Sequence, residues 1–65
     1  MENDYDQILI NIKDNYKMIE LYRKKTETNE DQYIREYYKN AIESLKIINI
    51  ALEKKLQERK TNPNL

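Results

Sequence analysis

The chain carries two stripes of apolar residues that mirror each other about a point near its middle. Both repeat at intervals of three and four residues, the spacing that places side chains on one face of an α-helix. The first stripe is Tyr5, Leu9, Ile12, Tyr16 and Ile19, and the second is Tyr38, Ala41, Leu45, Ile48 and Leu52. When the stripes are paired antiparallel, the two residue numbers of every pair sum to 57. The sequence therefore predicts a helical hairpin.

Residues that favour turns surround the midpoint of this pairing, which falls between Thr28 and Asn29. Thr26, Thr28 and Asn29 are typical of caps and turns rather than of helix interiors. Thr28 with Asp31, or Asn29 with Gln32, also resembles a capping arrangement for a new helix. We therefore predict an all-α, antiparallel two-helix hairpin with a helix over about 4–25, a turn at 26–29 and a helix over about 30–60.

A single long helix in an extended coiled coil is the alternative to the hairpin, because no glycine or proline interrupts the chain near residue 28. Continued beyond Ile19, the phase of the first stripe reaches only polar residues: Arg23, Thr26 and Glu30. The main stripe restarts one residue out of register, at Ile34. A phase break that coincides with turn-forming residues favours the hairpin.

A chain of 65 residues forms one domain at most. We predict a hairpin domain over 1–61 and a disordered C-terminal tail over 62–65, which contains Pro63. A domain this small buries only about 60% of its unfolded surface. Such domains usually need disulfides, a metal or self-association. Since the chain has neither cysteine nor histidine, we expect self-association, as a homodimer.

A second row of residues at helical spacing supports this expectation. In the C-terminal half the row is Tyr33, Tyr37, Asn40, Ser44, Ile47 and Ala51, and the N-terminal half offers Ile8, Asn11, Asn15, Met18 and Tyr22. The row in the C-terminal half is rotated by about 100° from the first stripe. Two hairpins can bury two stripes per helix in a four-helix bundle, whereas one hairpin cannot. We expect Asn11, Asn15 or Asn40 to fix the register of that bundle.

The residue types argue against catalysis. The absence of glycine excludes a glycine-rich phosphate loop, and the absence of cysteine and histidine excludes a zinc site of the ordinary kind. The Asp and Glu residues map to polar faces or helix ends, whereas acid–base catalysis needs sheltered carboxylates. We therefore predict a non-enzymatic protein without a cofactor, a metal or a small-molecule substrate.

A protein is the expected partner. Twelve basic residues balance twelve acidic ones, whereas binding to nucleic acid or anionic membranes usually shows a basic excess. The apolar runs are also far shorter than the ~20 residues of a membrane span. Leu56 continues the second stripe into an overhang beyond the shorter first helix. We predict docking on a protein through Tyr33, Tyr37, Ile47, Ile50 and Leu56.

The biological setting is read from composition. The start Met1-Glu2-Asn3-Asp4 is acidic, unlike a secretory signal peptide, so we expect a cytoplasmic protein. Abundant Ile, Asn, Lys, Tyr and Glu are typical of AT-rich genes. These features indicate a small regulator, inhibitor or adaptor from a low-GC bacterium, phage or plasmid.

Two other functions stay open. One is a purely structural subunit of a larger assembly. The other is nucleic-acid binding, because a dimeric hairpin of this length resembles, in architecture only, the Rop-type plasmid copy-number regulators. The resemblance implies binding to paired RNA loops, and we take Arg35, Lys39 and Lys46 as the candidate contacts.

Overall fold

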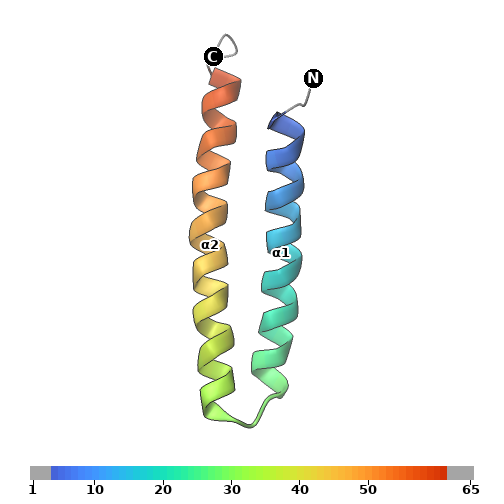
Figure 1. Cartoon of the computed structure of the whole chain (residues 1–65), viewed down its shortest axis with the longest axis vertical. Helices are drawn as coiled ribbons and strands as arrows, with labels where there is room; N and C mark the ends of the chain where they lie inside the picture. The colour runs from blue at the N-terminus through green and yellow to red at the C-terminus, as the bar shows by residue number, and fades with distance from the viewer. Residues whose placement is uncertain (1–3, 62–65) are drawn as a thin grey trace.

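Two antiparallel helices make up the described part of the chain (Figure 1). The computed structural model describes the backbone of residues 4–61 and the side chains of residues 4–59. Helix α1 spans Asp4–Thr28 and helix α2 spans Gln32–Thr61. The predicted all-α hairpin is thereby confirmed, and the predicted tail at 62–65 lies outside the described residues.

The first helix ends later than the sequence predicts. The hydroxyl groups of Thr26 and Thr28 donate hydrogen bonds to the backbone oxygens of Tyr22 and Lys24, at 2.9 and 3.0 Å. Each threonine therefore bonds back to the preceding helical turn and stays within α1. As a result the connection lies at 29–31 rather than at 26–29.

Side chains of the connection and of α2 fix the turn. The carboxylate Oδ1 of Asp31 accepts hydrogen bonds from the backbone N–H groups of Tyr33 and Ile34, at 2.9 and 3.4 Å. Asp31 is therefore the N-cap of α2. Asn29 Oδ1 accepts from the N–H of Asp31 at 2.9 Å. Arg35 donates to the backbone oxygens of Asn29 and of the residue after it, both at 3.0 Å.

A strict seven-residue repeat forms the contact between the helices, which we call the seam. Its positions alternate in steps of three and four, the spacing of a coiled coil. In α1 they are Tyr5, Ile8, Ile12, Asn15, Ile19, Tyr22 and Thr26, and in α2 Arg35, Tyr38, Ile42, Leu45, Asn49, Leu52, Leu56 and Arg59. All of them are buried or half-buried, and Ile8, Ile12, Ile19 and Ile42 are the buried hydrophobic residues among them.

The prediction that every residue of the two stripes is buried between the helices is wrong for alternate members. Leu9, Tyr16 and Ile48 are exposed, and their places in the seam are taken by neighbours that include Asn15 and Asn49. The prediction preferred the more apolar neighbour where it took Tyr16 over Asn15 and Ile48 over Asn49, whereas Leu9 and Ile8 are both apolar. Polar side chains can nevertheless occupy a core when they satisfy each other's hydrogen bonds.

The asparagine pair does this inside the seam. Asn49 is 2% exposed. Its Oδ1 accepts from Nδ2 of Asn15 at 2.9 Å, and its own Nδ2 donates to the backbone oxygen of Ile12 at 3.3 Å. Within residues 4–59 no buried side-chain nitrogen or oxygen lacks a partner.

The register of the two helices differs from the predicted one by a heptad. The numbers of the contacting pair Asn15 and Asn49 sum to 64 rather than 57. At the open end of the hairpin, Arg59 forms an ion pair with Asp4 at 3.1 Å. Leu56, seven residues beyond Asn49, is therefore level with Ile8. The predicted overhang at Leu56 is wrong, because α1 extends alongside it.

Candidate protein-binding face

The seam leaves two flanks along the length of the hairpin. One flank carries Leu9, Tyr16 and Arg23 of α1 and Lys39, Lys46 and Glu53 of α2, and we call it the charged flank. These rows lie side by side, since the Tyr16 hydroxyl donates a hydrogen bond to Glu53 Oε2 at 2.8 Å. This hydrogen bond, followed by the negative charge of Glu53 and by partial burial, raises the pKa of Tyr16 above its usual value.

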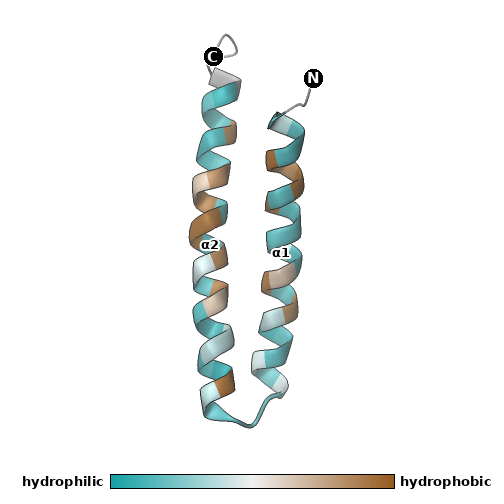
Figure 2. Ribbon diagram, viewed as in Figure 1, coloured by the Kyte–Doolittle hydropathy of each residue, from teal (hydrophilic) through white to brown (hydrophobic). Residues whose placement is uncertain are grey.

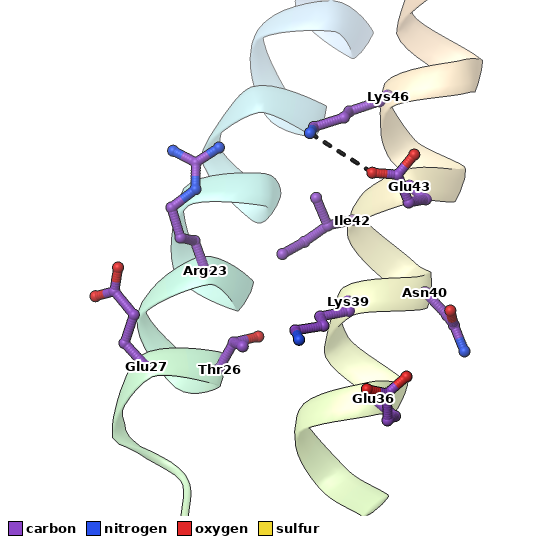
Figure 3. A pocket seen from close by; sticks show the side chains of 9 residues that line it. All are labelled: Arg23, Thr26, Glu27, Glu36, Lys39, Asn40, Ile42, Glu43 and Lys46. Carbon is purple, nitrogen blue, oxygen red and sulfur yellow. Dashed lines mark ion pairs between the residues drawn. The ribbon is translucent and has the colours of Figure 1, made fainter. Parts of the chain in front are cut away.

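A groove of about 560 Å³ opens on the charged flank near the turn (Figure 3). Its charged lining alternates in sign: Arg23, Lys39 and Lys46 with Glu27, Glu36 and Glu43. Lys46 forms an ion pair with Glu43 at 3.6 Å. Such a mixed lining provides no concentrated charge for a phosphate or a metal ion.

The candidate nucleic-acid contacts do not form one basic surface. The guanidinium of Arg35 donates to the carbonyl groups of the turn, and Lys46 is paired with Glu43. Lys39 lines the groove together with Glu36 (Figure 3). Arg35 therefore binds the turn, while Lys39 and Lys46 line one groove together with three glutamates.

Three of the five predicted protein-binding residues form the outer face of α2, on the side away from α1. Tyr33 is 88% exposed, and Ile47 and Ile50 are each 65% exposed. At about 100° per residue, Ile47 points almost directly away from the seam, with Tyr33 and Ile50 to either side of it. Figure 2 shows hydrophobic colouring on this side of α2 as well as on the side toward α1.

The other two predicted residues lie elsewhere. Tyr37 is exposed and borders the outer face, with its ring edge-on to Tyr38 at a centroid distance of 5.5 Å. Tyr38 also contacts Tyr22 across the seam at 5.1 Å. Leu56 is half-buried in the seam. The structure thus separates Leu56 from the outward-facing residues.

The second flank combines residues that the sequence prediction placed in the second row with residues that it placed in the core. On α2 it consists of six residues spaced by three and four, which we call the apolar flank: Ile34, Tyr37, Ala41, Ser44, Ile48 and Ala51. Met18 and Leu21 of α1 are exposed on the same side of the hairpin. The prediction placed Ala41 and Ile48 in the core, which hid this repeat. Its heptad spacing, identical to that of the seam, was the signal that could have revealed it.

Neither α1 nor α2 contains a stretch that is both long and apolar enough to cross a membrane, within the residues that the structure describes. Residues 4–59 also hold no group of three potential metal-binding side chains among Asp and Glu. Comparison of the chain with protein-family models, with curated proteins and with solved structures gives no match.

Proposed function

We propose that the chain is a non-enzymatic protein–protein interaction module that works as a homodimer of hairpins in a four-helix bundle. The observation that carries this proposal is the surface of α2. One side of this helix packs in the seam, while its outer face and its apolar flank expose aromatic and branched aliphatic side chains. Apolar residues clustered on adjacent sides of one helix are typical of contact surfaces.

The shape of the hairpin supports self-association. Its radius of gyration is 15.1 Å, whereas a compact chain of this length has about 10.7 Å. A rod of two helices has a thin core, here with four buried isoleucines in the described residues. Packing a flank against another hairpin adds buried apolar surface that stabilises both copies.

The outer face of α2 remains available to a different protein once a flank is buried. Tyr33, Ile47 and Ile50 spread over about 26 Å of helix. This length suits contact with a groove or another helix. We propose that the module acts as a cytoplasmic regulator, inhibitor or adaptor in a low-GC bacterium, phage or plasmid, as its size and composition suggest.

A tagged pull-down from the source cell, with and without nuclease, tests the interaction role. The test variant combines Tyr33→Lys with Ile47→Lys on the outer face of α2. Ile10→Lys is the control, because Ile10 is also exposed but lies on α1. Circular dichroism establishes that all three proteins are equally helical.

The proposal expects a protein that is retained after nuclease treatment, captured by the wild type and the control, and lost with the double variant. Capture that disappears with nuclease and falls steeply with salt would instead support the nucleic-acid alternative through Arg35, Lys39 and Lys46. Equal capture by the double variant and the control would contradict the outer face as the binding surface.

A further inference from the structure

We propose that the apolar flank binds a second copy of this chain, with the two α2 helices antiparallel about a two-fold axis level with Ser44. This inference rests on the proposed homodimer and specifies its geometry. It is argued from side-chain size, from the level of residues on α1 and from charge.

Side-chain sizes on the apolar flank are complementary to the same flank reversed. With the axis at Ser44, Tyr37 lies opposite Ala51 of the second copy, and Ala41 lies opposite Ile48. Ser44 meets its own counterpart at the axis. Tyr37 and Ile48 therefore each face an alanine, the arrangement that lets helices approach closely without voids, while Ile34 at the end of the flank lies opposite Lys55.

The same axis gives a matched contact between the two α1 helices. The Asn15–Asn49 pair fixes the level of one helix against the other. Ser44 lies five residues closer to the turn than Asn49, and residue 20 lies five residues closer to the turn than Asn15. Ser44 is therefore level with residue 20 of α1. Met18 and Leu21, 37% and 46% exposed, straddle that level. Met18 of one copy therefore lies opposite Leu21 of the other. The axis was chosen from the residues of α2 alone, so this match on α1 is independent of that choice.

Charged residues farther along the helices from the two-fold axis also agree with the antiparallel arrangement. Asp14 and Lys25 lie on either side of the Met18 and Leu21 patch, so the axis places Asp14 of one copy opposite Lys25 of the other. On α2, the axis places Lys55 near the end of the partner helix that follows the acidic connection residues Glu30 and Asp31. Each exposed pair contributes only ~0–1 kcal/mol, but the signs select the orientation.

A parallel dimer on the same flank would lose these matches. Tyr37 would face Tyr37, Ala51 would face Ala51, and Lys55 would face Lys55. The large rings would hold the helices apart while the small residues left gaps between them. Like charges facing each other also oppose association.

The area of the flank is sufficient for a stable dimer. A standard interface takes about 800 Å² from each partner, which is about one seventh of the 5445 Å² accessible surface of this chain. The chain extends over 50 × 18 × 13 Å, so a flank that runs along both helices presents about 900 Å².

Disulfide cross-linking tests the geometry, because the chain has no cysteine of its own. A disulfide needs Cα atoms about 4.4–6.8 Å apart. Ser44→Cys should form a covalent dimer readily under mild oxidation. Ala51→Cys alone should not, since its counterpart would be about 21 Å away along the helix. Mixing Ala51→Cys with a mass-tagged Tyr37→Cys should give the mixed dimer. Lys17→Cys, on α1, is the control that should stay unlinked.

Sedimentation of the wild type separates this inference from the proposed homodimer. A wild type that stays monomeric at every concentration would overturn both, while the pull-down still tests the interaction role. A wild-type dimer in which Ser44→Cys does not cross-link would overturn only the geometry. Ala51→Cys linking alone as readily as Ser44→Cys would establish the parallel arrangement and also overturn it.

Discussion

At the scale of single residues, the buried asparagine pair decides which register the helices adopt. A shift by one heptad would keep every seam position in the seam, since the repeat is strict. That shift would, however, place Asn15 opposite Ile42 and Asn49 opposite Ile8, so that the half-buried amide of Asn15 and the buried amide of Asn49 would lose their partners. An unsatisfied buried polar group costs about 1–3 kcal/mol. The pair therefore selects the observed register over the nearest alternative.

Removing one asparagine and removing both should have opposite consequences. Asn15→Ala leaves the amide of Asn49 without its side-chain partner, and we expect a loss of about 1–3 kcal/mol in the free energy of unfolding. The double variant Asn15→Leu, Asn49→Leu leaves no amide to satisfy and should be at least as stable as the wild type. Urea unfolding followed by circular dichroism measures both. A double variant less stable than Asn15→Ala would contradict this account.

The hydrogen bond from Tyr16 to Glu53 makes the stability of the hairpin depend on pH in the alkaline range. The bond raises the pKa of Tyr16 above the value of about 10 that it has in an unfolded chain. The folded chain therefore holds this proton more tightly, and the bond stabilises the fold below pH 10. This contribution is lost as the pH rises through the folded-state pKa.

Tyrosine ionisation, followed by ultraviolet absorbance, tests this expectation. The difference between the wild type and Tyr16→Phe should report a tyrosine that ionises above pH 10. Glu53→Ala removes both the hydrogen-bond acceptor and the negative charge, and should shift that ionisation back toward the usual value. An unchanged titration in Glu53→Ala would show that Glu53 does not cause the shift.

At the scale of the helices, the choice between neighbouring residues determines which side of α1 is buried. Ile8 is buried in the seam, whereas Leu9 is exposed beside it. Ile8→Ala should cost about 2–5 kcal/mol because it leaves a cavity in a thin core. Leu9→Ala should cost only about 0.5 kcal/mol, as for other surface positions. Thermal unfolding of the two variants side by side measures the difference, and a larger loss for Leu9→Ala would reinstate the stripe expected from the sequence.

The seam residues show which positions of each helix the sequence could identify. Stripes spaced by three and four were sufficient for two antiparallel helices, because Ile12, Ile19, Leu45 and Leu52 are apolar and lie in the seam. Hydrophobicity could not identify Asn15 and Asn49, because asparagine fits a core only through a partner on the other helix. At Ile8, hydrophobicity alone could not decide against its apolar neighbour Leu9. The sequence also allowed two registers a heptad apart, and the hydrogen-bonded pair Asn15 and Asn49 distinguishes them.

The same limit applies to the candidate binding surface. Tyr33, Ile47 and Ile50 could be placed outside the seam from their helical phase alone. Leu56 could not, since its environment depends on the register, which the contact between Asn15 and Asn49 sets. Ile48 was misplaced for the same reason as Asn49, its neighbour in the chain. Local periodicity thus predicts faces of a helix well, while contacts across the hairpin require three-dimensional information.

At the scale of the whole molecule, folding of the thin rod and association of its copies should be coupled. Each hairpin in the proposed bundle gains buried surface from the other, and mass action then links stability to concentration. The midpoint of thermal unfolding should rise as the wild-type concentration increases. Ile48→Lys puts a charge on the apolar flank without touching the seam, so its midpoint should be lower and independent of concentration. Ile10→Lys, an equal change on the outer side of α1, should keep the concentration dependence of the wild type.

Circular-dichroism melts over a wide concentration range measure all three proteins. A wild-type midpoint that does not change with concentration would show that the hairpin folds alone and that its apolar flank does not stabilise it through self-association.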